Sequence, residues 1–500
     1  MLPAVISREI EAGIKSFLRT TFPPSTPAFE RTLNVFLDEP GRVFKGPYYS
    51  LRLPFRPAPA GQLPFAEIAF PYRPHLHQAQ AFSRLCGEEP RSTLVATGTS
   101  SGKTECFLYP ILDACAARIG DPGIKAIIIY PMNALATDQA KRFAQAIYAD
   151  EKLRGKVTAG LFIGGESDQS VAMTPDWLIT NKGHLREHPP DILLTNYKML
   201  DFLLLRPEEQ PLWRDSAPET LRFLVVDELH TFDGAQSTDL ACLIRRLKTR
   251  LRTPENHLCC VGTSATLGSP GSVTPLVEYA CTIFSEPFDK ESVIGEDLLT
   301  LGDMVDGYFI RYHGVPELDA STLALAGAES HPELYLAEQF RLWFENEAPA
   351  NLGEIEGRVA LGERLREHSF FRNLLTLAER SGRKVLSEEW LIHELTQMVG
   401  DTPGPARTKR LLDSFLSLCA HARYRDAESG AAGPLLRVHV HLWTRELSHL
   451  VASVTDPPRM AFSDDLKGEA LKSHLPVIHC RECGAMGWGG TMRANAEKVV

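Results

Sequence analysis

The chain has 500 residues with a formal net charge of -10 at pH 7, and 44% of its residues are hydrophobic and 23% charged. This length fits roughly three domains at about 150 residues each, and this composition excludes a mainly disordered, collagen-like or coiled-coil protein. No apolar run approaches the roughly 18 residues that a bilayer span requires, and Arg8 and Glu9 interrupt the first apolar stretch. We therefore expect a cytoplasmic protein without a signal peptide or a membrane partner.

Charge and cysteine content limit the kinds of partner and the kinds of fold that the chain can have. The 53 Lys and Arg residues are outnumbered by 63 Asp and Glu residues, so the surface as a whole does not predict nucleic-acid binding, and any such binding has to use a local groove. The 10 Cys residues are scattered and far too few for a disulfide scaffold. Most of them are expected to be small buried side chains.

In chain order, residues 1–71 are predicted to form a Pro-rich N-terminal lead-in with short extended pieces and no long elements. Between residues 72 and 290, short apolar runs alternate with amphipathic stretches. This alternation predicts right-handed crossovers in a parallel sheet with helices on both faces, which is an α/β fold. The predicted strands are 92–97, 125–130, 157–163, 191–195, 221–227 and 258–264, and the predicted helices are 103–118, 133–150, 197–205 and 235–250.

Helical periodicity replaces the alternation in residues 291–430, which are predicted to form a mostly helical insertion. Residues 431–500 follow as a short segment with a half-buried strand at 437–443 and a Cys pair in a Gly-rich loop. Packing of the helices on one another or on the sheet is the simplest interpretation of their apolar faces. The positions expected on these faces are Leu386, Trp390, Leu391, Leu395 and Met398, and then Leu411, Leu412, Phe415, Leu416 and Cys419.

The segment LVATGTSSGKTE (94–105) follows a predicted strand and opens a helix, which is the context of a phosphate-binding loop. In such a loop Lys103 would reach the β- and γ-phosphate oxygens and the Thr104 hydroxyl would hold Mg²⁺, while backbone amides surround the β-phosphate. The strict pattern has Gly where Thr97 stands, and GKT in a purely structural turn is the alternative. The predicted loop consists of Thr97, Gly98, Thr99, Ser100, Ser101 and Gly102.

A carboxylate pair follows another apolar run, where FLVV leads into Asp227 and Glu228. Adjacent residues that leave a strand point in different directions. Asp227 can therefore orient Mg²⁺ through water, while Glu228 faces an attacking water molecule as general base. A solvated turn is the alternative interpretation of the pair taken alone.

Together these segments resemble motifs I, II and III of superfamily-two DEAD/DEAH-box (DExH) helicases, because GKT, DELH and the Ser264-Ala265-Thr266 triplet occur in that order. The segments TGTSSGKT and DELHTFDGAQ are most similar to the large YprA (MrfA)/Lhr-like DNA helicases, which include Druantia-type anti-phage helicases. The resemblance covers about residues 72–290 and implies a RecA-like domain of the P-loop NTPase type. It also implies ATP and Mg²⁺ as cofactors and DNA as partner.

The resemblance implies further roles for individual residues. Gln78 in HQAQAF would contact the adenine edge, Ser264 and Thr266 would couple nucleotide state to domain movement, and His230 would bridge motifs II and III. His230 as a packed core residue is the alternative. Motifs Ia and Ib would supply a nucleic-acid track that bonds backbone phosphates, although each residue also suits an ordinary cap or turn. The track residues would be Pro131, Asn133, Leu135, Gln139, Thr195 and Asn196.

Cys480 and Cys483 have the spacing of half a zinc site, for which four ligands are usual. His474 and His479 lie nearby, although a ligand His directly before a ligand Cys is awkward. Free thiols are the alternative.

Motif VI, which supplies an arginine from the second RecA-like domain of such motors, has no counterpart in residues 271–500. We therefore expect a second RecA-like domain in a further part of the polypeptide or in another chain. Two other functions stay open. The chain could be a nucleotide-dependent nucleic-acid-binding subunit without turnover of its own, or an RNA helicase.

Overall fold

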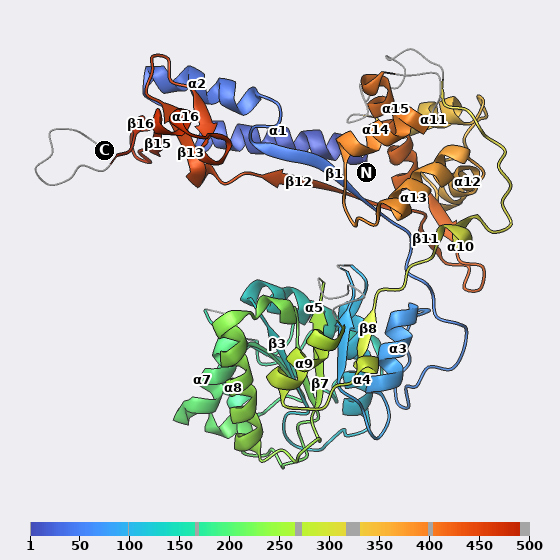
Figure 1. Ribbon diagram of the computed structural model, residues 1–500. Coiled ribbons are helices and arrows are strands. Elements are labelled where there is room, and N and C mark those ends of the chain that lie inside the picture. Colours follow the sequence, from blue (N-terminus) through green and yellow to red (C-terminus); the bar gives the residue numbers. More distant parts are fainter. Residues whose placement is uncertain are drawn as a thin grey trace, which may run out of the picture. The chain divides into compact units, whose positions relative to one another are not determined.

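The computed structural model describes residues 2–98, 100–165, 170–265, 273–316, 331–398 and 404–490. The chain divides into two compact units (Figure 1), and this division differs from the four predicted segments. One unit is Phe55–Leu298. The other combines Met1–Pro54 with Leu299–Val500.

The Phe55–Leu298 unit is built on a parallel sheet, as predicted. Within its described residues, seven strands lie in the order β4-β5-β3-β6-β7-β2-β8, and every pairing is parallel. The strands are β2 (Thr93–Ala96), β3 (Ala126–Tyr130), β4 (Ala159–Phe162), β5 (Ile192–Asn196), β6 (Phe223–Val226), β7 (Cys259–Ser264) and β8 (Val293–Gly295). The helices are α3 (Leu76–Leu85), α4 (Lys103–Ala116), α5 (Asn133–Ala149), α6 (Lys182–Glu187), α7 (Tyr197–Leu205), α8 (Gly234–Leu251) and α9 (Val273–Phe284), with short 3₁₀ helices η1 (Pro207–Trp213), η2 (Leu229–Thr231) and η3 (Lys290–Ser292).

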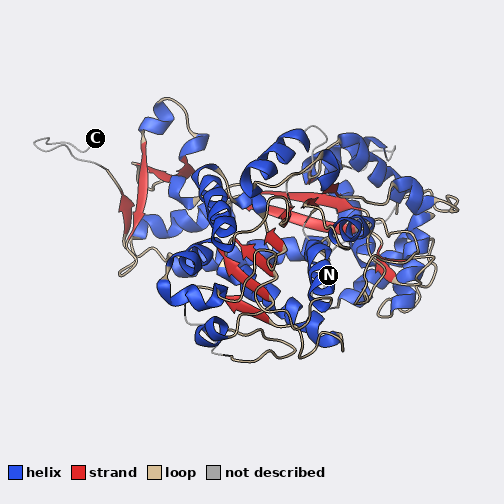
Figure 2. Cartoon of the chain, turned by 90° about the horizontal axis from the view of Figure 1, so that it is seen from below, coloured by secondary structure: helices blue, strands red, loops and turns tan. Residues whose placement is uncertain are grey.

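Two apolar cores lie on the two faces of this sheet because alternate side chains of a strand point to opposite faces. In β3, Ile128 packs into one core together with residues of α3, α4 and α5, whereas Ile127 and Ile129 pack into the other with residues of α7, α8 and α9. Figure 2 shows the strands between the helices that cover them. Continuous apolar strands are the signature of a sheet buried on both faces, so the predicted α/β fold is confirmed.

The second unit contains helices from both ends of the chain and three small antiparallel sheets among its described residues. Its sheets have the orders β12-β1-β9, β14-β13-β15-β16 and β10-β11. Its helices are α1 (Pro3–Thr21), α2 (Pro27–Asp38), α10 (Leu301–Val305), α11 (Pro332–Trp343), α12 (Ile355–Arg366), α13 (Ser369–Ser381), α14 (Glu388–Met398), α15 (Pro405–His421) and α16 (Glu469–Lys472), with η4 (Leu447–His449) and η5 (Ser463–Asp465). Its strands are β1 (Phe44–Arg52), β9 (Leu386–Ser387), β10 (Arg423–Arg425), β11 (Ala432–Pro434), β12 (Arg437–Thr444), β13 (Leu450–Ser453), β14 (Met460–Phe462), β15 (His474–His479) and β16 (Met486–Trp488).

The prediction that residues 1–71 contain no long elements was wrong. Pro3 and Pro27 each stand in the first turn of a helix, α1 and α2, where the amide that proline lacks has no intrahelical partner in any case. Both helices contribute to a core, in which Phe29 and Phe36 pack with Phe462 from the other end of the sequence. The Pro-rich composition therefore marked helix starts as well as extended chain.

The apolar faces predicted for the helical segment are confirmed in large part. Leu411, Leu412, Phe415, Leu416 and Cys419 are all buried in α15. In the preceding segment Leu391 and Leu395 are buried in α14, and Leu386 is buried in β9. Met398 was predicted to share this face but is 44% exposed, at the last residue of α14.

Nothing in the described part of the chain is a helix long and apolar enough to pass through a lipid bilayer.

A buried ion pair ties together the amino-terminal ends of three strands of the parallel sheet. The side chains of Lys125 and Asp191, which precede β3 and β5, are 3% and 15% exposed, and Lys125 Nζ lies 2.5 Å from Asp191 Oδ1. Asp191 Oδ2 also accepts hydrogen bonds from the backbone amide and the hydroxyl of Thr158, just before β4, at 2.7 and 3.0 Å. One carboxylate therefore satisfies groups from two neighbouring strands.

Substitution of Asp191 by Ala should lower the free energy of unfolding by about 3–5 kcal/mol, because it leaves the Lys125 ammonium buried without its counter-charge. The matched control is Asp176→Ala, which breaks the pair with Lys141 at a site where both side chains are more than half exposed. That change should cost less than about 1 kcal/mol. Urea unfolding followed by tryptophan fluorescence measures both, and equal costs would contradict a structural role for the buried pair.

Candidate nucleotide-binding site

The loop between β2 and α4 has the backbone geometry of a phosphate-binding loop. Gly102 caps α4 with φ of +79°, a left-handed conformation in which a side chain is strained. A Cβ atom at this position would lie 2.3 Å from Nε2 of Gln78. The left-handed φ favours glycine here, and a side chain would also displace the amide of Gln78. The loop then leads directly into Lys103 at the start of α4, where backbone amides without intrahelical partners favour an anion.

Side chains of helix α3 form hydrogen bonds with the backbone of this loop. Gln78 Nε2 donates to the carbonyl of Gly102 at 3.2 Å, while its Oε1 accepts from the amide of His75 at 2.9 Å. His77 Nε2 lies 2.8 Å from the carbonyl of Ser101, and burial lowers the pKa of His77, which favours the neutral ring. Gln78 thus contacts the loop backbone in addition to lining the cavity in front of it.

Two carboxylates face the loop from the end of β6. Lys103 Nζ lies 3.1 Å from Glu228 Oε1, with both side chains largely buried. Asp227 accepts a short hydrogen bond from the hydroxyl of Thr263 in the neighbouring strand β7. Burial raises the pKa of Asp227, and the hydrogen bond from Thr263 opposes this shift. The same Thr263 hydroxyl accepts from the amide of Glu228 at 3.1 Å, so one residue of β7 holds both members of the pair.

Motif III and motif II are in contact through His230. Its Nδ1 lies 3.1 Å from the hydroxyl of Ser264 and 3.4 Å from Glu228 Oε2. This position favours the bridging role over a packed core histidine, because the ring is partly exposed. Thr266, the other predicted coupling residue, and Thr99 of the loop lie outside the described residues.

The loop, the carboxylate pair and Gln78 line a cavity of about 660 Å³, within the range of small-molecule sites. Its wall also contains residues that the sequence interpretation did not assign, namely Phe70, Tyr72, Arg73, His75, Glu105 and Arg142. Phe70 and Tyr72 precede Gln78 by a few positions, and two aromatic residues beside a glutamine that lines a nucleotide cavity are the signal that could have found them. Arg142 becomes visible only in three dimensions, because α5 lies beside α4.

Oxygen donors in the cavity suit a hard cation such as Mg²⁺. The hydroxyl of Thr104 and the carboxylate of Asp227 both face the cavity, and Glu228 Oε2 is buried without a hydrogen-bond partner. The Thr104 hydroxyl donates to Gln139 Oε1 at 3.1 Å. The residues present therefore fit the predicted magnesium ligands.

The residues predicted for the nucleic-acid track separate into two groups. Leu135 and Gln139 line the nucleotide cavity, and the Thr195 side chain is fully buried, with its hydroxyl donating to the carbonyl of Phe162 at 2.7 Å. Burial of the Thr195 side chain argues against its predicted contact with a nucleic-acid strand, whereas the contacts predicted for the half-buried Leu135 and Gln139 stay predictions. Leu135 and Gln139 stand on the side of α5 that borders the cavity.

Asn133 and Asn196 remain as an accessible pair at the carboxyl edge of adjacent strands. Asn196 Nδ2 donates to Asn133 Oδ1 at 2.6 Å, and Asn196 Oδ1 accepts from the amide of Met199 as the cap of α7. Pro131, which is half-buried, lies just before the start of α5. The pair therefore joins the amino ends of two helices.

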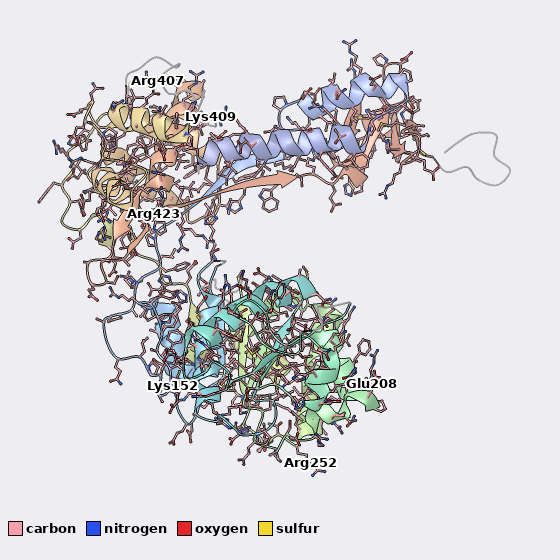
Figure 3. All side chains as sticks on the ribbon, turned by 180° about the vertical axis from the view of Figure 1, so that it is seen from behind. Lys152, Glu208, Arg252, Arg407, Lys409 and Arg423 are labelled. Carbon is pink, nitrogen blue, oxygen red and sulfur yellow. The ribbon has the colours of Figure 1, made fainter. Side chains whose placement is uncertain are left out.

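The arginines that follow motif II point elsewhere. Helix α8 begins shortly after Glu228 and ends at Leu251, and its C-cap Arg252 lies at the far end of the unit in Figure 3. Arg245 donates to the carbonyl of Thr282 at 3.0 Å, and Arg246 pairs with Asp201. These side chains are not among those that line the cavity.

Cys480 and Cys483 are exposed free thiols. In the described ranges of the chain, no three His, Cys, Asp or Glu side chains come together in a group that could hold a metal ion. The structure therefore does not support the predicted zinc site, because the two cysteines find no further ligand among these residues.

Comparison with known proteins relates the sequence around the cavity to a family. The family model described as DEAD/DEAH box helicase matches residues 75–272. Druantia protein DruE of Escherichia coli is 26% identical over 45% of this chain and 18% of its own length. The uncharacterized ATP-dependent helicase YprA of Bacillus subtilis is 30% identical over 39% of this chain and 23% of its own length.

Solved structures also resemble the chain. The DUF1998 helicase MrfA bound to DNA is 20% identical, with a TM-score of 0.38 over 58% of this chain and 38% of that chain. The Mycobacterium smegmatis helicase Lhr bound to ssDNA and AMP-PNP is 22% identical, with a TM-score of 0.34 over 53% and 30% of the two chains. The chain spans less than a third of the length of the curated relatives named above. With the family match and the sheet, loop and carboxylate pair taken together, residues 75–272 form a DEAD/DEAH box helicase domain.

Proposed function

We propose that this chain is the nucleotide-binding part of an ATP-dependent DNA helicase or translocase. The observation that carries the proposal is the ion pair between Lys103 and Glu228 in the wall of a cavity. Asp227 and the loop before α4 line the same cavity. Phosphoryl-transfer sites need a cation at the phosphates, a metal-orienting carboxylate and a group that positions the attacking water. The three side chains match these three needs.

The ion pair suggests how nucleotide binding prepares the site. Lys103 Nζ lies 3.1 Å from Glu228 Oε1, so its charge balances that of the carboxylate. Phosphate oxygens beside the loop would compete for the ammonium group, since charge-assisted bonds to phosphate are strong. Glu228 would then lose its counter-charge and become available to accept a proton from water. His230 lies 3.4 Å from Glu228 and 3.1 Å from Ser264. A change in the charge balance of Glu228 would therefore act through His230 on Ser264 of motif III.

We also propose that the Asn133 and Asn196 pair contacts the phosphates of a nucleic-acid strand. Small polar side chains and helix amino ends bind phosphates without reading bases. Several relatives are named ATP-dependent RNA helicases, among them RNA helicase 29 of Oryza sativa at 28% identity. A strand-displacement assay with DNA and RNA duplexes would decide between the two substrates.

Lys103→Ala should weaken the binding of Mg·ATP about 10- to 100-fold, because it removes the charge-assisted contacts to the phosphates. Isothermal titration calorimetry measures the change, with Lys141→Ala, an exposed lysine of the same unit, as the control. Unchanged affinity in Lys103→Ala would exclude this loop as the phosphate site.

Glu228→Gln should retain ATP binding while reducing turnover about 10²- to 10⁴-fold, since the amide keeps the shape of the side chain but cannot accept the proton. The measurement is DNA-stimulated phosphate release by a protein that contains both RecA-like domains. Glu278→Gln, an exposed change on α9, is the control. Full activity of Glu228→Gln would move the base to another residue.

A second RecA-like domain, in a further part of the polypeptide or in another chain, would supply the missing arginine. The 500 residues alone should therefore bind ATP but hydrolyse it slowly, with little stimulation by DNA. An arginine provided in trans raises such rates by about 10³ to 10⁵. Fast DNA-stimulated hydrolysis by these residues alone would instead point to an arginine already within them, with Arg142 and Arg73 of the cavity wall as the first to test.

A further inference from the structure

Strands β1 and β12 form an antiparallel ribbon in the second unit, although they are almost 400 residues apart in sequence, and the two residues of β9 pair with Tyr48 and Tyr49 on the other edge of β1. Figure 1 shows β1 and β12 side by side. Paired residues of antiparallel strands share one face of the ribbon. The register pairs Lys45 with Trp443, Tyr48 with His441, Ser50 with His439 and Arg52 with Arg437. We define these eight residues as the ribbon face.

The orientation of this face is fixed by the residues between them. Tyr49, Leu51, Val438 and Val440 point the other way and pack into the large core of the unit. A slip of one residue would turn that apolar set outward, so the register is strongly determined. A bulge between Lys45 and Tyr48 preserves the pattern. The ribbon face is therefore a consequence of core packing, and its side chains lie on the side of the strands opposite that core, although Ser50 is itself only 3% exposed.

The ribbon face is positively charged in a chain whose net charge is -10. It carries Lys45, Arg52 and Arg437 and no carboxylate of its own. Partial burial, followed by the positive charges of Arg52, His441 and Arg437, lowers the pKa of His439. The hydrogen bond from Arg445, at 2.6 Å, lowers the pKa of Asp465, and the charge of Lys45 acts on Asp465 in the same direction.

An exposed aromatic residue lies at one end of this charged face. Trp443 is 63% exposed and stands opposite Lys45 in the register. Half-buried Tyr48 follows on the neighbouring strand. Residues two apart along a strand are about 6.7 Å apart, so the face presents cations and aromatic rings in a row of roughly 20 Å.

We propose that the ribbon face binds a single strand of nucleic acid, with Lys45, Arg52 and Arg437 at the backbone phosphates and Trp443 stacked on a base. Cations along a groove combined with exposed aromatic rings are the chemistry of single-strand binding without sequence preference. This site lies in the unit that lacks the nucleotide cavity. The biological use of this site rests on the proposed function, because the site would bind the substrate strand of the motor independently of ATP.

The test is fluorescence anisotropy of a labelled oligodeoxythymidine strand of about 20 nucleotides, long enough to cover one such site, titrated with the full 500-residue chain. Trp443→Ala should weaken binding about 5- to 100-fold through loss of one stacked base. The control is Phe309→Ala, which removes an aromatic ring that is 87% exposed in the same unit. It should leave the affinity unchanged.

Arg437→Ala should weaken binding and reduce the slope of log affinity against log salt by about 0.7 for one lost phosphate contact on a single strand. Arg383→Ala, at an exposed arginine between α13 and α14, is its control and should change neither. Circular dichroism melting of all four variants verifies that they fold. Affinity and salt slope that stay at the parent values in both ribbon variants would overturn the proposal.

Two further measurements distinguish a failure of the ribbon site from a failure of the proposed function. Lys103→Ala should lose ATP affinity while keeping ATP-independent strand binding, and Trp443→Ala should do the reverse. If strand binding is abolished by Asn133→Ala but untouched by the ribbon variants, the ribbon site is wrong and the motor proposal stands. Equal competition by polyglutamate of the same charge would assign the face to acidic segments instead and would also overturn the inference.

Discussion

The contact between Lys103 and Glu228 depends on a single constraint, the parallel order of the central sheet. Parallel strands bring all their carboxyl ends to one edge. The loop after β2, the carboxylates after β6 and Ser264 at the end of β7 therefore meet there, although more than 150 residues separate the first from the last. An antiparallel neighbour would have sent one of these groups to the opposite edge. The buried pair of Lys125 and Asp191 stabilises the other edge and so supports the same order.

The site is held by contacts that do not involve a ligand. Thr263 fixes both carboxylates, Gln78 fixes the carbonyl of Gly102, and the sharp turn at Gly102 leaves no room for a side chain. Such preorganisation reduces the cost of ordering the site when a nucleotide binds. The groups that would change partner on binding are the charged ones, Lys103 and Glu228, which are paired with each other.

The second unit is stabilised by pairing and packing between segments from the two ends of the chain. Its ribbon combines strands from near both ends of the chain, and its cores contain helices from before and after the helicase domain. The helicase domain is therefore inserted between two parts of one folded unit, at Pro54 and Leu299. The two parts share their cores, since β1 pairs with β12, α2 packs with β14, and Leu2, Val5, Tyr49 and Leu53 join a core whose other residues all follow Leu298. This arrangement places two chemically different surfaces, a nucleotide cavity and a cationic ribbon face, on separately folded bodies.

The sequence by itself determined six of the seven described strands of the parallel sheet, the helices α4, α5, α7 and α8, and the residues around Gly102, Lys103, Asp227 and Glu228. These follow from local patterns, namely apolar runs, glycine at a left-handed turn and charged residues after a strand. Only the tertiary structure decided that Thr195 is buried, that Arg142 lines the cavity and that Arg437 lies beside Arg52. The physical reason is that burial and pairing between distant segments depend on which faces pack together. Local sequence periodicity states which side of an element is apolar, but it does not state which partner covers that side.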